Sequence, residues 1–156
     1  MAGLSNMMRH YLSVKEKYPD CIIFYRLGDF YEMFFEDAKL VSQELDLVLT
    51  GRSAGVEEKV PMCGVPFHAA NSYISRLVKK GYKVAICEQL EDPSSAKGLV
   101  DRGIVKIITP GTYMDATMDA KSTNYMASCS VSSFEITVIY CELSTGELKY
   151  QTLQRS

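Results

Sequence analysis

Stretches typical of strands alternate with stretches typical of helices over the first 112 residues of this 156-residue chain, and this alternation constrains the fold most. β-Branched and aromatic runs such as Cys21–Leu27 are typical of strands, and Gly28 ends this one. Ser5 can cap a first helix, in which apolar residues recur at helical spacing. The alternation predicts an α/β (α+β) fold in which helices flank a mixed β-sheet. The expected strands are 21–27, 47–50, 82–90 and 103–109, and the expected helices are 5–18, one ending near 45, and 69–80.

The character of the chain changes after Thr112. Residues 113–123 are small and polar and are typical of a linker, whereas 124–156 contain three expected strands joined partly by a hairpin turn at 144–146. About thirty residues of hairpins form a poor independent core. We therefore expect a first domain over 1–112 and, after the linker, β-hairpin strands of an incomplete second domain. The three expected strands are 125–130, 134–143 and 147–152.

The composition is that of a folded chain, with 47% hydrophobic and 23% charged residues. The formal net charge of −2 gives no global signal for nucleic acid, although residues 76–106 hold seven basic residues against four acidic ones. Such a basic stretch could meet phosphates or be an ordinary solvated surface. The five scattered cysteines favour reduced, buried thiols in a cytosolic protein. No apolar run approaches the roughly 18 residues of a membrane span.

Aromatic and acidic residues crowd around Gly28 in the segment 24–37. One interpretation is a helix start, with Asp29 as the N-cap and Glu32 as its partner in an acidic capping box. It explains Phe30 less well, because the first helical position usually faces solvent. The second interpretation is an aromatic side chain displayed beside an acid at a backbone break. Composition and pattern leave both interpretations open.

Other candidate chemistry lies between residues 60 and 90. Pro61 and Pro66 restrict the segment 60–68 to extended or turn geometry, and Cys63 and His68 within it could form a thiol nucleophile pair. His68 could equally be a structural residue before the next helix. The sequence lacks a P-loop, and its two histidines have no metal-ligand spacing with cysteine. A small enzyme using Cys63, His68 or Glu88 and a plain interaction domain remain alternatives.

Several blocks resemble one family in the same order and cover residues 4–112. Residues 24–32 (FYRLGDFYE), 61–69 (PMCGVPFHA), 84–89 (VAICEQ) and 109–112 (TPGT) are similar to the N-terminal mismatch-recognition domain of the MutS family of DNA mismatch repair proteins. The tail at 124–127 and 143–146 resembles the start of that family's connector domain. Blocks in register are far more specific than a single motif. The resemblance favours a DNA-mismatch sensor over the two alternatives.

The resemblance implies that Phe30 wedges at a mispaired or unpaired base and that Glu32 hydrogen-bonds it. Phosphate contacts would come from basic side chains, with Arg52 the first choice, and Met62 could touch the sugar edge. Lys97 and Arg102 are weaker candidates from the basic stretch. The expected DNA-binding residues are therefore Phe30, Glu32, Arg52, Met62, Lys97 and Arg102.

The resemblance also implies partners. The ligand would be mismatched double-stranded DNA, and this part of the family protein would be non-catalytic, without a cofactor or metal. Full-length family members would be homodimeric, DNA-dependent ATPases that use ATP and Mg²⁺. They would work with downstream repair factors such as MutL, in the bacterial cytoplasm at the nucleoid and without a membrane partner.

Backbone geometry distinguishes the two interpretations of the 24–37 segment. Residues two apart on a helix point about 200° apart, whereas residues two apart on an extended strand share a face. If Phe30 and Glu32 both serve DNA, their segment should be extended, with the helix starting at or after Glu32. The Phe30 ring should then be exposed, whereas a deeply packed ring would favour the plain interaction domain.

Overall fold

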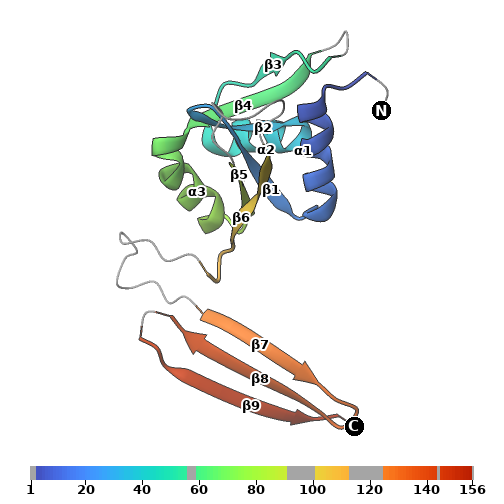
Figure 1. The fold of residues 1–156 in the computed structure, drawn as a ribbon. Helices are drawn as coiled ribbons and strands as arrows, with labels where there is room; N and C mark the ends of the chain where they lie inside the picture. Colours follow the sequence, from blue (N-terminus) through green and yellow to red (C-terminus); the bar gives the residue numbers. More distant parts are fainter. Residues whose placement is uncertain (1–2, 56–58, 91–100, 113–124, 144, 156) are drawn as a thin grey trace. The chain divides into compact units, whose positions relative to one another are not determined.

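The computed structural model of the protein describes residues 3–55, 59–90, 101–112, 125–143 and 145–155 (Figure 1). The chain divides into two compact units, Met1–Pro110 and Gly111–Ser156. The first unit is a six-stranded mixed sheet flanked by helices, and the second is a separate antiparallel sheet. The predicted α/β (α+β) class with a mixed sheet is confirmed.

The sheet of the first unit has β1 near its middle. β1 and β5 run parallel, with Ile23 opposite Ala85, and the other neighbouring strands are antiparallel. β2 lies between β1 and β4, so both of its edges are hydrogen-bonded. The order across the sheet is β3 (Thr50–Arg52), β4 (Val60–Pro66), β2 (Phe30–Phe34), β1 (Cys21–Leu27), β5 (Lys83–Gln89) and β6 (Arg102–Ile108).

Helix α1 (Asn6–Lys17) covers part of one face of this sheet. The predicted cap is confirmed, because the Ser5 hydroxyl accepts a hydrogen bond from the backbone N–H of Met8 at 3.4 Å. The buried side of the helix packs against alternate residues of β1 and β5, which face it because side chains alternate along a strand. The core cluster on this face includes Met8, Tyr11, Val14, Cys21, Ile23, Tyr25, Phe34, Ala85 and Cys87.

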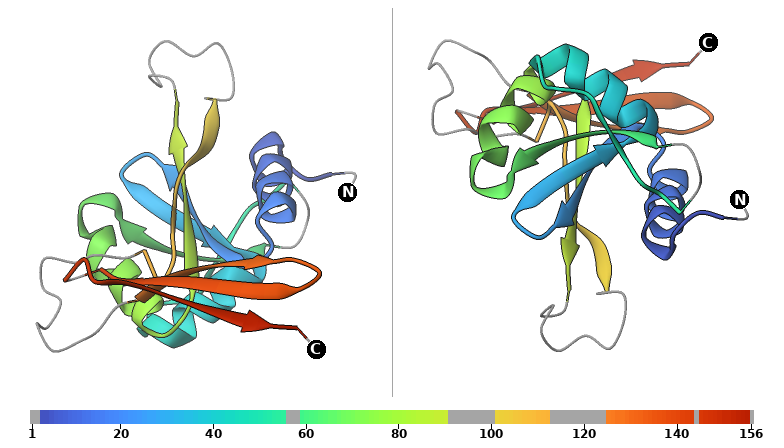
Figure 2. Two further views of the ribbon diagram at one scale, coloured as in Figure 1. Left: turned by 90° about the horizontal axis from the view of Figure 1, so that it is seen from below. Right: turned by 90° about the horizontal axis from the view of Figure 1, so that it is seen from above.

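Helices α2 (Phe35–Leu45) and α3 (Ala70–Lys79) lie together on the opposite face (Figure 2). A short 3-10 helix, η1 (Phe67–Ala69), precedes α3. The predicted helix over 69–80 is confirmed, and Gly81, with a φ of +94°, follows its end. With helices on both faces, the five residues Cys21–Tyr25 of β1 are all buried.

One of the two interpretations of the 24–37 segment and one expected strand were wrong. Asp29 does not cap a helix, because α2 begins after Phe34, which has no side-chain cap hydrogen bond. The strand expected over 47–50 is instead the short β3, which begins at Thr50. α2 ends at Leu45, its C-cap Asp46 has a φ of +56°, and the apolar pair Val48 and Leu49 is 84% and 46% exposed. An apolar pair that stays in solvent has no face of a sheet to pack on.

The second unit is an antiparallel sheet in the order β7 (Tyr125–Val131), β8 (Glu135–Glu142) and β9 (Leu148–Gln154). The three predicted strands are confirmed. The predicted linker, 113–123, lies outside the described residues, as does residue 144 of the predicted hairpin turn. Among the described residues, none of the helices has the length and hydrophobicity that a membrane span needs.

Candidate nucleic-acid interface

A tight hairpin joins β1 to β2. Leu27 pairs with Phe30, so Gly28 and Asp29 form a two-residue turn. Gly28 has a φ of +55°, which suits a glycine at the first position of such a turn. The register places Arg26 opposite Tyr31 and Tyr25 opposite Glu32. Phe30 is therefore the first residue after the turn, at the tip of the hairpin.

The side chains of β2 alternate between two environments. Tyr31 and Met33 are buried on one face, whereas the Phe30 ring is 46% exposed and Glu32 is half-buried on the other. An extended backbone places residues two apart on the same face. Both geometric expectations are confirmed, because α2 begins only at Phe35 and the Phe30 ring is exposed.

Phe34 shares this face but is fully buried. Its ring meets the Tyr11 ring of α1 edge-on, with centroids 5.1 Å apart and an interplanar angle of 87°. α1 therefore covers the Phe34 end of β2 and leaves the Phe30 end open. This uncovered end of the sheet face is the candidate interface.

Glu32 and Arg52 form an ion pair across this face. Arg52 comes from β3, two strands away, and β4 lies between them. Gly64 of β4 faces Glu32, and a Cβ there would lie 3.4 Å from the Glu32 Cγ and 3.3 Å from the Tyr31 carbonyl oxygen. The absence of a side chain at Gly64 thus leaves room for the Glu32 side chain. The Glu32 side chain is 14% exposed and that of Arg52 is 37% exposed, so the pair is accessible from solvent.

The other predicted site residues are placed differently. Met62 lies opposite Phe34 on β4, at the end of β2 that α1 covers, and packs against the core cluster. Arg102 is only 9% exposed, and its Nε donates a hydrogen bond to the Arg26 carbonyl oxygen at 3.1 Å. It lies on β6, at the opposite edge of the sheet from Arg52. Lys97 lies outside the described residues. The structure therefore joins Glu32 to Arg52 on the face that carries Phe30, places Met62 at the covered end of β2, and gives Arg102 a structural position.

A second cluster beside the hairpin did not emerge from the sequence. The Arg26 guanidinium lies 3.9 Å from the centre of the Phe67 ring and 4.0 Å from the Glu88 carboxylate. Glu88 also accepts a hydrogen bond from the Tyr31 hydroxyl, and burial raises the pKa of Tyr31 to about 12. One signal was available, because a two-residue turn at Gly28 already places Arg26 opposite Tyr31.

The thiol hypothesis fits the structure poorly. Burial raises the pKa of Cys63 to about 12, and its Sγ donates to the Ala38 carbonyl oxygen at 3.5 Å. A thiol in this state is almost wholly protonated at neutral pH and is a poor nucleophile. His68 lies in η1 with its ring against Phe67.

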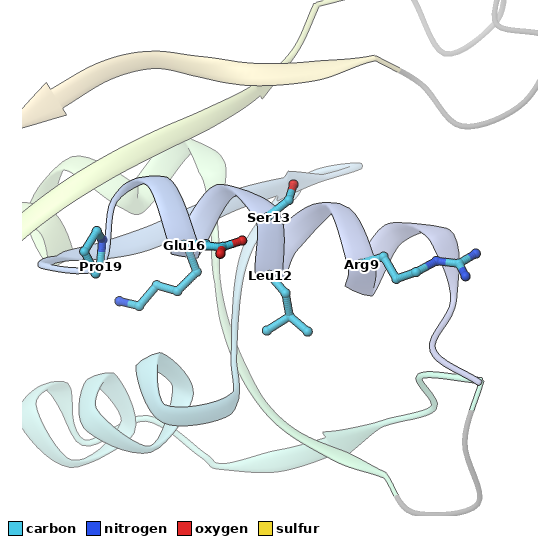
Figure 3. Close-up of a pocket in the computed structure, with 6 residues that line it drawn as sticks. Arg9, Leu12, Ser13, Glu16 and Pro19 are labelled. Atoms are coloured by element: carbon cyan, nitrogen blue, oxygen red, sulfur yellow. The ribbon is translucent and has the colours of Figure 1, made fainter. Parts of the chain in front are cut away.

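A shallow pocket of about 480 Å³ lies along α1, away from the candidate site residues (Figure 3). Neither Cys63 nor His68 is among its lining residues, so it adds no support for the thiol hypothesis. The pocket is lined by Arg9, Leu12, Ser13, Lys15, Glu16 and Pro19.

Comparison with known proteins assigns this architecture to a family. The family model for MutS domain I matches residues 5–117. A DNA mismatch repair protein MutS from Clostridium botulinum (strain Loch Maree) is 61% identical over 146 residues, which cover 93% of this chain and 16% of that relative. A DNA mismatch repair protein MutS from Clostridium kluyveri is 57% identical over 149 residues, covering 93% of this chain and 17% of the relative. The chain thus spans about a sixth of the length of these relatives. With most of its length matched by the family model and by close relatives, the chain belongs to the MutS domain I family.

Proposed function

We propose that this chain is the mismatch-recognition module of a DNA mismatch repair protein and is not itself an enzyme. The observation that carries the proposal is the Phe30 ring, 46% exposed at the tip of a two-residue hairpin and on the same strand face as Glu32. A rigid aromatic wedge beside a hydrogen-bonding side chain is an arrangement suited to entering a base stack. Membership of the MutS domain I family supports the same function.

The energetics of wedging favour a mismatch over paired DNA. Burying a Phe side chain contributes roughly 1.5–3 kcal/mol. Unstacking one base step costs a few kcal/mol, so insertion of Phe30 at a paired step is close to neutral or unfavourable. A mispaired or unpaired base is already weakened, and the balance then shifts towards insertion. One wedge can therefore recognise many different mispairs through their deformability.

The ion pair with Arg52 gives Glu32 a role in the specificity for mismatched DNA. A free carboxylate is repelled by phosphates, but Arg52 neutralises Glu32 while the duplex is intact. At a displaced base, Glu32 can hydrogen-bond the base and Arg52 can turn to a phosphate. Breaking the Glu32–Arg52 ion pair is unfavourable when no displaced base offers Glu32 a hydrogen bond in its place. Met62, at the covered end of β2, remains a proposed contact to the sugar edge, and Lys97 remains a proposed phosphate contact.

The remaining parts of the proposal belong to a full-length protein that carries this chain. There, ATP hydrolysis with Mg²⁺ in other domains would couple recognition to repair, in a homodimer that works with MutL in the bacterial cytoplasm. Residues 1–112 would form the recognition domain and 124–156 the start of the connector domain. The isolated chain would bind DNA weakly and with a steep dependence on salt, because most of the DNA-binding surface would lie in other parts of the full-length protein.

The test is a binding comparison in the full-length protein that carries this chain. Dissociation constants are measured for a duplex with one mismatch and for its fully paired counterpart. We expect Phe30→Ala to bring mismatch binding down to the level of the paired duplex, because no ring remains to fill the weakened step. Val48→Ala removes a more exposed apolar side chain outside the interface and should preserve the preference. Equal binding of both duplexes by the wild-type protein would contradict the proposal and favour a plain interaction domain.

A further inference from the structure

The turn that carries Phe30 is held from the face opposite the ring. Arg26 pairs with Tyr31, so its side chain leaves β1 on the face away from Phe30. Its Nε donates a hydrogen bond to the Gly28 carbonyl oxygen, and its guanidinium lies 3.9 Å from the centre of the Phe67 ring. The same guanidinium lies 5.6 Å from the centre of the Tyr31 ring. Arg26 thus connects the turn to two aromatic rings.

Phe67 holds the other residue of the turn. Its backbone N–H donates to the Asp29 carbonyl oxygen at 2.9 Å, and it directly follows Pro66, which lies opposite Phe30 in the sheet. Arg26 and Phe67 stack on each other, and together they donate hydrogen bonds to the carbonyl oxygens of both turn residues, Gly28 and Asp29. Carbonyl groups at a hairpin tip are otherwise left to water, which does not fix the position of the turn.

The charge of Arg26 is engaged within the protein. The Glu88 carboxylate lies 4.0 Å from its Nη1 and also accepts a hydrogen bond from the Tyr31 hydroxyl. The Arg26 side chain is 17% exposed, about half the exposure of the Arg52 side chain at 37%. The guanidinium of Arg26 therefore stacks on an aromatic ring, donates a hydrogen bond to the turn and has a carboxylate nearby that balances its charge. These contacts suit a structural role better than phosphate binding.

We propose that Arg26 and Phe67 are positioning residues that clamp the Gly28–Asp29 turn and hold the Phe30 ring ready for insertion. The inference rests on the proposed function, because the clamp acts through Phe30. A ring that is already fixed loses less conformational freedom when it enters the base stack than a ring on a free turn. The clamp therefore raises the affinity for mismatched DNA without contacting the DNA.

The test uses variants of the full-length protein that keep the fold and remove the stack. Arg26→Lys keeps the charge but loses the planar group and its Nε donor, and Phe67→Leu loses the ring but keeps the backbone N–H. We expect each to lower the preference for mismatched over paired DNA by about two- to thirtyfold, the range that corresponds to one cation–π contact. Binding of the paired duplex should be unchanged. Arg76→Lys makes the same exchange at an exposed residue of α3 and should leave both affinities unchanged.

A salt titration separates positioning from direct contact. If Arg26 binds a phosphate, Arg26→Gln reduces the slope of log K against log salt by about one unit and weakens both duplexes alike, which would overturn the positioning role. An unchanged slope with a reduced mismatch preference supports it. If Phe30→Ala abolishes the preference while Arg26→Lys and Phe67→Leu preserve it, the clamp is wrong and the proposed function stands. If Phe30→Ala also preserves the preference, the proposed function itself fails.

Discussion

The two ends of β2 carry the same side chain in opposite surroundings. Phe30 and Phe34 lie on one face of the strand, yet Phe34 is fully buried and Phe30 is 46% exposed. The difference is α1, whose Tyr11 ring packs on Phe34 and whose coverage ends before Phe30 is reached. Identical chemistry therefore serves the core at one end of the strand and remains free for a ligand at the other.

The largest expected effect is at the covered end. Phe34→Ala should lower the free energy of unfolding of this chain by about 3–5 kcal/mol, because it empties a packed site that the Tyr11 ring lines. Urea unfolding followed by circular dichroism measures the loss. A loss below about 1 kcal/mol would show that the two ends of β2 do not differ as described.

The second-largest expected effect on stability is at Asp37, the buried residue of α2 that links α2 to α1 and β1 near the covered end. Asp37 is buried and accepts hydrogen bonds from the Tyr11 hydroxyl at 2.9 Å and the Ile23 N–H at 3.0 Å, and it pairs with Lys15 at 2.8 Å. Asp37→Asn removes the charge and leaves Lys15 without its ion-pair partner. This should cost about 2–3 kcal/mol of unfolding free energy, because Lys15 keeps some contact with water and its hydrogen bond to the Cys21 carbonyl oxygen.

Glu36→Gln is the matched control for Asp37→Asn. Glu36 also pairs with a lysine, Lys39, but its side chain is 82% exposed. Loss of this exposed ion pair should change the unfolding free energy by less than about 0.5 kcal/mol. If parallel urea titrations give the same loss of unfolding free energy for Asp37→Asn and Glu36→Gln, the burial of Asp37 contributes little to stability.

The smallest expected effect on stability is at the open end. Phe30→Ala should change the unfolding free energy by no more than about 0.5 kcal/mol, since nearly half of Phe30 is already exposed to solvent and the open end has no helix packed on it. The same variant is expected to remove mismatch preference, so stability and binding should separate at this residue. A thermal unfolding scan beside the wild-type chain checks this. A loss comparable to that of Phe34→Ala would assign Phe30 to the core.

The local parts of the fold could be predicted from the sequence. Ser5 and the apolar spacing after it predict α1. If Phe30 and Glu32 share a face, their segment is extended, and this predicts a helix that starts at or after Glu32. The competing capping-box interpretation was locally satisfactory. It failed because β2 gains hydrogen bonds from β4, whose residue Pro66 lies opposite Phe30. Pairing between distant segments leaves no mark in a local pattern.

The site could be predicted only in part for the same reason. Phe30 and Glu32 are neighbours in sequence, so their shared face follows from strand geometry. The pairing of Glu32 with Arg52 and the stacking of Arg26 on Phe67 depend on the order of strands across the sheet. Arg102 was selected on the basic composition of its stretch, and composition does not distinguish a buried arginine from an exposed one.

The pairing of β2 on both edges restricts how this region can vary in length. Deleting one residue from 30–34 would turn Tyr31 and Met33 towards the open face and drive an acidic side chain into the core beneath α2, because the side-chain period of a strand is two. Neither neighbouring strand can slip to compensate, since each is itself paired on its far edge. Redesign of this recognition surface should therefore proceed by substitution, and insertions or deletions within the strand should be avoided.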